Sequence, residues 1–384
     1  MLWQIKTLAA QKVFTSATEI AEEVVRRRLP AGAPCPSLPS IDNMARAANR
    51  MRRQLRPRHP SDLAFDLNRG HVPDQFRAFD TRARTSRHIV LATNVQLELL
   101  SRAKTWYVDG TFKVVRAPFT QLASIHAFIK KDGQLKQIPL CFIYMSRRKT
   151  KDYCVVLRKV IEVLPRPPAV SQVVSDFERA FWKATAKVLP WVKQRGCAFH
   201  WGQAIWRQIQ QRGLATAYMT QHGVYSYCKK LLALPFLPAT SIATVFDQLE
   251  AKANSPELQS LVTYIRGTWI DSRLWPPTAW SVYGQPVRTN NDVEGWHHRL
   301  NRKAGNNGLN MYLLFELLQQ EAEIAELNVR LLSDRKVRRP QWKSTVRART
   351  KLNRYWQEYE DGSRSVSRLL QACARLYAPQ RVDQ

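Results

Sequence analysis

The sequence predicts an α/β (α+β) fold in which a small mixed sheet with flanking helices is interrupted by a long helical insertion. Residues 105–145 hold three apolar runs rich in β-branched and aromatic residues, and an Asp-Gly pair marks a tight turn between the last two. A helical segment at 151–164 and a fourth apolar run at 172–176 follow. From 214 to 285, apolar and aromatic residues recur at helical spacing. This order predicts strands first, then a helical insertion.

The composition predicts a globular protein, and the charge predicts a polyanionic partner. The chain has 384 residues, is 45% hydrophobic and contains 12 Trp, which is enough for two or three domains with a substantial core. Its net charge of +30 predicts a polyanionic partner, with nucleic acid as the leading candidate. The alternative is a solvated basic surface, but such an excess repels itself unless a partner offsets it.

The cysteine spacing predicts a reducing compartment, and the hydropathy predicts no membrane helix. Its 6 cysteines include no Cys-x-x-Cys pair, so neither a disulfide framework nor a four-cysteine zinc site is predicted. No apolar run approaches the roughly 18 residues that a membrane helix needs. We therefore expect a soluble protein that is neither secreted nor bound to a membrane.

The N-terminal 100 residues are predicted to form a helical DNA-binding region and a linker. A helix at 6–28 is followed by a Pro-rich loop and a second helix capped by Ser40 or Asp42. One face of the second helix is basic and carries Arg46, Arg50 and Arg53. This face predicts phosphate contacts, with a solvated surface as the alternative. Residues 57–86 are expected to be a linker or cap, and 88–103 a helix.

Three carboxylates lie beside apolar runs, where a solvated acid is not expected. Asp109 and Asp176 are in or at the end of predicted strands. Glu294 lies on a predicted helix, opposite the face that carries Val293 and Trp296. Singly, these acids would be a turn residue, a helix cap and part of a capping box. Together they predict a site for Mg²⁺ or Mn²⁺, because such ions prefer oxygen ligands and two of them serve phosphodiester chemistry.

A family resemblance rests on four motifs between residues 105 and 303. In chain order they are DGTF, SDFE, GCAFHW and TNNDVEGWHHRLN. Together they resemble the Mutator-like (MULE) transposases. The resemblance implies a ribonuclease-H-like catalytic domain with a five-stranded mixed sheet, and an all-helical insertion before the glutamate helix. It also implies a two-metal Asp, Asp, Glu triad, which maps onto Asp109, Asp176 and Glu294.

The resemblance and the helix pattern together suggest boundaries within the chain. After the N-terminal region, the first part of the catalytic core is expected at 101–213 and the helical insertion at 214–285. The glutamate helix at 286–305 returns to the core. Residues 306–384 form a C-terminal helical, basic region.

A Cys-x-x-His pair, which the resembled family keeps between its second and third acids, corresponds to Cys197 and His200. A fifth strand is expected at 195–201 and would include both residues. The pair supplies half of a zinc site, which normally takes four ligands, so zinc is an alternative without a complete ligand set. A buried thiol beside a satisfied histidine is the other alternative. With His297 and His298, the pair is expected to support the acids.

The C-terminal region begins with a long amphipathic helix that is also compatible with coiled-coil pairing. Residues 335–354 then hold nine basic residues and no acid. The candidates for DNA contact among them are Arg338, Arg339, Lys343 and Arg347. Such a cluster suits contact with the DNA backbone, nuclear import or both, with a solvated tail as the alternative.

Two functions follow from these residues. The first is a nuclear DNA transposase that acts on double-stranded DNA, both the terminal inverted repeats of its element and the target, as a homodimer or higher oligomer. The second is a domesticated, transposase-derived regulator that binds DNA without cutting it. Retention of all three carboxylates favours the enzyme.

Overall fold

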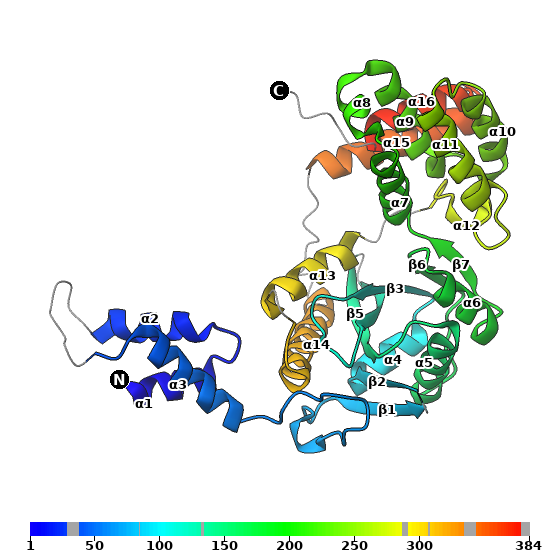
Figure 1. Cartoon of the computed structure of the whole chain (residues 1–384). Helices are drawn as coiled ribbons and strands as arrows, with labels where there is room; N and C mark the ends of the chain where they lie inside the picture. Colours follow the sequence, from blue (N-terminus) through cyan, green and yellow to red (C-terminus); the bar gives the residue numbers. More distant parts are fainter. Residues whose placement is uncertain are drawn as a thin grey trace.

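The computed structural model divides into an N-terminal helical unit, an α/β core and a helical domain (Figure 1). It describes residues 1–28, 38–83, 85–131, 134–285, 291–305, 308–333 and 343–377. None of the helices within these ranges combines the length and the apolarity needed to cross a membrane.

The core is built on one mixed sheet. Its described strands are β1 (Arg77–Ala83), β2 (Ser86–Ala92), β3 (Thr105–Thr111), β4 (Gln121–Lys131), β5 (Gln134–Met145), β6 (Gln172–Ser175) and β7 (Lys193–Gly196). They are ordered β1-β2-β5-β4-β3-β6-β7, and only the β3–β6 and β6–β7 pairs are parallel. The five strands from β5 to β7 have the predicted ribonuclease-H-like arrangement. The α+β fold class is therefore confirmed, and β1 and β2 extend the expected five-stranded sheet by two strands.

The register of the parallel pair fixes the relation between two of the acids. Val108 of β3 lies opposite Ser175 of β6. Asp109 is the residue after Val108, and Asp176 is the residue after Ser175. Because parallel strands keep even spacing, these neighbours come to the same edge of the sheet.

Helices cover both faces of the sheet (Figure 1). On one face, α4 (Asn94–Arg102), α5 (Thr150–Val163) and α6 (Arg179–Val188) share an apolar core with the strands. On the other, α13 (Asn291–Ala304) and α14 (Met311–Ser333) do the same. The predicted long amphipathic helix is thus α14, and its apolar face packs on the sheet.

The expectation of one helix across 88–103 was wrong for its first half, which forms β2. Every residue of β2 is buried, so its apolar run has no alternation that would distinguish a strand from a buried helix. The helix α4 begins only after Thr93, whose side chain forms a capping box with Gln96. The segment at 57–86, expected to be a linker or cap, contains β1, which pairs with β2 along its whole length.

The N-terminal unit contains three described helices, α1 (Leu2–Gln11), α2 (Ala17–Arg28) and α3 (Ile41–Gln54). The predicted helix at 6–28 is therefore two helices. They pack around a small apolar core that includes Ile5, Ile20 and Met44. Ser40 caps α3 as predicted, because its side chain accepts a hydrogen bond from the Asn43 amide.

The helical domain contains the predicted insertion. Its described elements are α7 (Ala198–Gln211), α8 (Leu214–Thr220), α9 (His222–Leu232), η2 (Leu234–Phe236), α10 (Ala239–Glu250), α11 (Pro256–Ile265), η3 (Arg266–Ile270), α12 (Pro277–Trp280), α15 (Lys343–Glu360) and α16 (Val366–Tyr377). Trp269 and Trp280 of the predicted insertion are at most 2% exposed and form its core together with the buried Trp201 of α7.

The last two helices join this domain although they follow the core in sequence. Leu352, Trp356 and Leu369 belong to the same apolar cluster as the insertion. The Trp356 indole donates a hydrogen bond to the carbonyl oxygen of Phe236, at 2.9 Å. Two distant segments of the chain therefore build one helical core.

Candidate functional site

The three predicted acids converge at one end of the sheet. Asp109 is buried in β3, opposite Ser124 of β4, and Asp176 directly follows β6. Glu294 lies in the first turn of α13. Thr111 of β3 donates a hydrogen bond to Asn301 of α13 at 3.0 Å, which holds this helix against the strand that carries Asp109. Two strands and one helix supply the carboxylates, as the sequence predicted.

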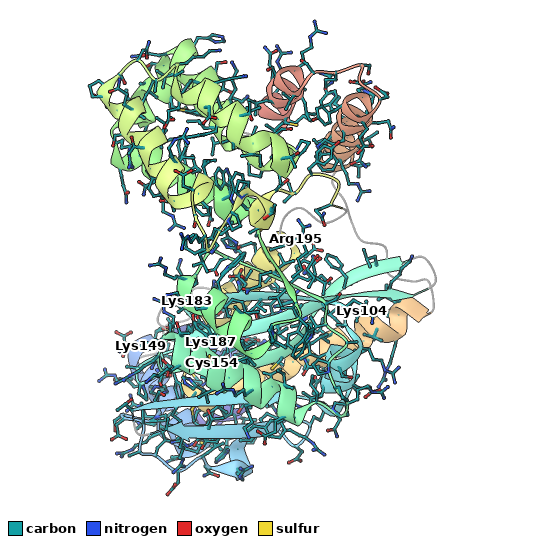
Figure 2. All side chains as sticks on the ribbon, turned by 90° about the vertical axis from the view of Figure 1, so that its right-hand side faces the viewer. Lys104, Lys149, Cys154, Lys183, Lys187 and Arg195 are labelled. Carbon is teal, nitrogen blue, oxygen red and sulfur yellow. The ribbon has the colours of Figure 1, made fainter. Side chains whose placement is uncertain are left out.

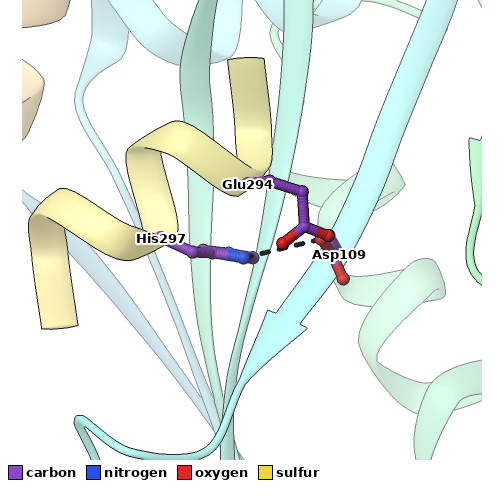
Figure 3. Close-up of side chains that lie close together, drawn as sticks. All are labelled: Asp109, Glu294 and His297. Atoms are coloured by element: carbon purple, nitrogen blue, oxygen red, sulfur yellow. Dashed lines mark ion pairs between the residues drawn. The ribbon is translucent and has the colours of Figure 1, made fainter. Parts of the chain in front are cut away.

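Asp109, Glu294 and His297 form the tightest group of potential metal ligands (Figure 3). One ligand atom of each lies within 4.8 Å of those of the other two. His297 Nδ1 is 3.5 Å from Asp109 Oδ2. His297 is three residues after Glu294, so both side chains project from the same face of α13.

Asp176 faces the same space from the neighbouring strand. Together with Asp109 and Glu178, it lines a cavity of about 40 Å³ at the sheet edge. The Glu178 amide donates to Asp176 Oδ1 at 3.2 Å, but Asp176 does not cap α6, because the N-cap residue of that helix is Glu178. Tyr153 holds Glu178 by donating to Oε2 at 2.8 Å. The cavity is large enough for a small number of water-sized groups or ions.

Burial and mutual repulsion alter the protonation of these acids. Burial, with the negative charges of Glu294 and Asp176, raises the pKa of Asp109 to about 7, against the opposing influence of His200. Burial also raises the pKa of Asp176, while His200 and Arg148 oppose the rise. A divalent cation would relieve both effects, because it supplies the positive charge that the two carboxylates lack.

His200 connects Glu294 to the helical domain. It lies in the first turn of α7, and its Nε2 atom is 3.1 Å from Glu294 Oε1. Burial lowers the pKa of His200, but hydrogen bonds with Cys197 and Glu294 raise it to about 11. The hydrogen bond with His200 correspondingly lowers the pKa of Glu294. At neutral pH a protonated imidazole thus holds an ionised glutamate.

The fifth strand is shorter than predicted at 195–201, and this expectation was wrong for its second half. β7 ends at Gly196, Cys197 is the N-cap residue of α7, and His200 is helical. A Cβ atom at Gly196 would come within 2.1 Å of the Phe177 ring, so only glycine allows this close approach. The strand-to-helix change aims His200 at the acids.

The two histidines of α13 have different environments. His297 is buried, and burial lowers its pKa to about 4, which leaves a neutral imidazole able to bind a cation. Its Nε2 atom is 3.3 Å from Ser124 Oγ. His298 is exposed and lies outside the three-residue group. Sequence periodicity predicted both histidines near the acids, but the packing of α13 places only His297 in the group with Asp109 and Glu294.

The donor set fits a hard divalent cation. Asp109 and Glu294 offer oxygen atoms, His297 offers a neutral nitrogen, and Asp176 faces the same cavity. The only group of three or more ligands within the described ranges contains no cysteine, so Cys197 and His200 do not belong to a thiolate zinc site there.

The predicted DNA-contacting residues that the structure describes lie on α3 and α15, outside the α/β core that carries the acids (Figure 1). Arg46, Arg50 and Arg53 are all exposed on α3. Arg347 is exposed on α15, and Lys343 is the first residue of that helix. The remaining two, Arg338 and Arg339, lie outside the described residues.

The sheet order and the acid site define a protein of the ribonuclease-H-like class. Residues 105–204 match the model of the MULE transposase domain. This match supports a MULE-family transposase and implies DNA binding. It includes Asp109 and Asp176 but ends before Glu294, whose place therefore rests on the folded structure. No curated protein matches the chain.

Proposed function

We propose that this protein is a Mutator-like DNA transposase that hydrolyses phosphodiesters at the ends of its element and transfers the freed 3′-OH strand to target DNA. The observation that carries the proposal is the convergence of Asp109, Asp176 and Glu294. The β3–β6 register brings the first two together, and α13 adds the third from beyond the helical insertion. Three carboxylates at one site repel one another and destabilise the fold unless a cation is bound, which favours a functional role over a structural one.

Asp109, Asp176 and Glu294 would hold two Mg²⁺ or Mn²⁺ ions, with His297 as an additional nitrogen ligand. When bound, such ions activate the attacking oxygen and stabilise the leaving oxygen of a phosphodiester. The surrounding residues orient the acids. The Gly110 amide fixes Asp109 at 2.8 Å, the Glu178 amide fixes Asp176, and His200 fixes Glu294.

The proposed partners are the terminal inverted repeats and the target DNA. The net charge of +30 and the exposed arginines of α3 support contact with DNA phosphates. We further propose a homodimer or higher oligomer, because joining two element ends requires two sites. The basic segment at 335–354 supports nuclear import, which the localisation of a fluorescent full-length fusion would test.

The test is divalent-metal-dependent cleavage by the full-length protein of DNA that carries the inverted repeats flanking its gene. Asp109→Asn, Asp176→Asn and Glu294→Gln should each reduce cleavage and strand transfer by several orders of magnitude while DNA binding persists. The exposed His298→Gln is the matched control on α13. If the unaltered protein binds these repeats but never cuts them, the transposase is ruled out and a non-cutting DNA-binding regulator replaces it.

A further inference from the structure

An exposed aromatic side chain lies at the mouth of the acid site. Phe112 directly follows β3 and lines the same cavity as Asp109 and Asp176. Its side chain is 51% exposed, although Thr111 before it and Val114 two residues after it are buried. Phe112 is three positions after Asp109, a span of at most about 10 Å.

A cation is already stacked on this ring. The Arg148 guanidinium carbon lies 4.7 Å from the centroid of the Phe112 ring. The pair joins the end of β3 to the loop before α5, and Phe112, on which Arg148 lies, lines the acid cavity. An aromatic ring next to a guanidinium suits a nucleotide. The base can stack on the ring, and the phosphate can accept hydrogen bonds from the N–H groups of the guanidinium.

The surrounding surface is basic. Arg147, Arg148, Lys149 and Lys151 are exposed around the start of α5. Within the parts of the chain that the structure describes, none of these four is within ion-pair distance of a carboxylate. Lys183 and Lys187 of α6 lie on the same side of the core as Lys149 (Figure 2). The carboxylates of the acid site would repel DNA phosphates, and the positive charges of this surface would attract them.

We propose that Phe112 and Arg148 bind a locally unpaired nucleotide beside the scissile phosphate, with the base stacked on Phe112 and its phosphate held by Arg148. The inference rests on the proposed function and specifies its substrate as DNA that is unpaired at the cleavage point. A base exposes its face to a side chain only after leaving the duplex stack. The closeness of Phe112 to Asp109 places the stacked base within one or two nucleotides of the reacting phosphate.

The first experiment measures binding without metal and without chemistry. An Asp109→Asn background is titrated against two fluorescent oligonucleotides, one fully paired and one with a few unpaired nucleotides next to the repeat end. We expect Phe112→Ala and Phe112→Leu to weaken binding of the unpaired substrate about 10-fold and to leave duplex binding unchanged. Phe112→Trp should restore the affinity, because it restores a stacking surface.

Two matched controls separate stacking from general effects. Trp191 is 58% exposed but does not line the acid cavity, so Trp191→Ala should bind both substrates normally. Arg148→Ala should weaken binding of the unpaired substrate, whereas Arg166→Ala should not. Arg166 carries the same charge and lies just beyond the far end of α5, about 20 Å of helix away from its start.

The second experiment follows one base directly. A 2-aminopurine at the unpaired position should be quenched on binding to the protein with Phe112 and remain bright with Phe112→Leu. Equal quenching by both proteins, or equal losses for duplex and unpaired DNA, would overturn the proposal. Because neither readout requires cleavage, this result is independent of whether the protein proves to be an active transposase.

Discussion

His200 Nε2 lies 3.1 Å from Glu294 Oε1, although the whole helical insertion separates the two residues in the chain. The contact joins the first turn of α7 to the first turn of α13. The protonated imidazole in the first turn of α7 therefore helps to position the glutamate that follows the insertion. His200 is a positioning residue in this arrangement.

His200→Gln should reduce cleavage and raise the Mg²⁺ concentration needed for half-maximal rate, each about 10- to 100-fold, because Glu294 loses its orienting partner. The measurement is a metal titration of cleavage, with DNA binding measured in parallel. His298→Gln is the control, since that histidine is exposed on α13. An unchanged metal requirement in His200→Gln would show that Glu294 is held by other contacts.

Metal affinity should rise with pH between 6 and 8. Burial raises the pKa of Asp109 to about 7, so the carboxyl must lose its proton before it binds a cation. Near pH 6, calorimetry in buffers of different ionisation enthalpy should detect about one proton released per site. Asp109→Asn should abolish this release. A pH-independent affinity would contradict the prediction.

The same shift has a consequence for stability without metal. The folded-state pKa of Asp109 is above its ordinary value of 3.8, so folding favours the protonated carboxyl. The stabilisation is fully present below about pH 4 and is lost as the pH rises through 7. Saturating Mg²⁺ should remove this loss, which thermal unfolding with and without the ion would measure.

Trp356→Ala should lower the free energy of unfolding by about 3–5 kcal/mol, because it empties a large core position and leaves the Phe236 carbonyl without its donor. Trp356 is 6% exposed in the helical core. Leu327→Ala on α14, where the side chain is 52% exposed, should change it by less than about 0.5 kcal/mol. Urea denaturation provides the comparison, and equal effects would mean that α15 does not stabilise the domain.

Neutralising Arg46, Arg50 and Arg53 to Gln should weaken DNA binding and reduce the slope of log affinity against log salt by about three. The control removes the same charge from ion-paired positions of the core, as Arg102→Gln, Lys159→Gln and Arg166→Gln. If both triple variants show the same slope, α3 presents a solvated face and not a DNA contact.

The sequence predicted the central strands and the positions of the acids because each lies where a local pattern changes. Asp176 ends an apolar run, and Glu294 lies opposite the apolar face of a helical period. These signals are local, and the β3–β6 register then brings Asp109 and Asp176 together. The sequence and the family resemblance grouped the three acids, whereas the distances between them and the part played by His297 needed the fold.

The missed elements lacked a local signal or had a misleading one. β2 is buried on both faces, so its run has no strand period. The Thr93-x-x-Gln96 capping box is the sequence signal that could have placed the start of α4. At Cys197 the apolar, aromatic sequence favoured a strand, whereas β7 ends at Gly196, where the Phe177 ring packs closely against the backbone. The choice of His297 over His298 depends on the rotation of α13 against the sheet, which no single-helix pattern contains.

The core of the helical domain is assembled from residues on both sides of the glutamate helix, and this sets an order for its maturation during synthesis. The insertion emerges from the ribosome first, followed by α13 and α14, while α15 and α16 come last. Until Leu352 and Leu369 arrive, the insertion leaves apolar surface uncovered, in a state prone to aggregation. A chain that stops before residue 343 thus carries every acid of the site on its α/β core, next to a helical domain with an unfinished core.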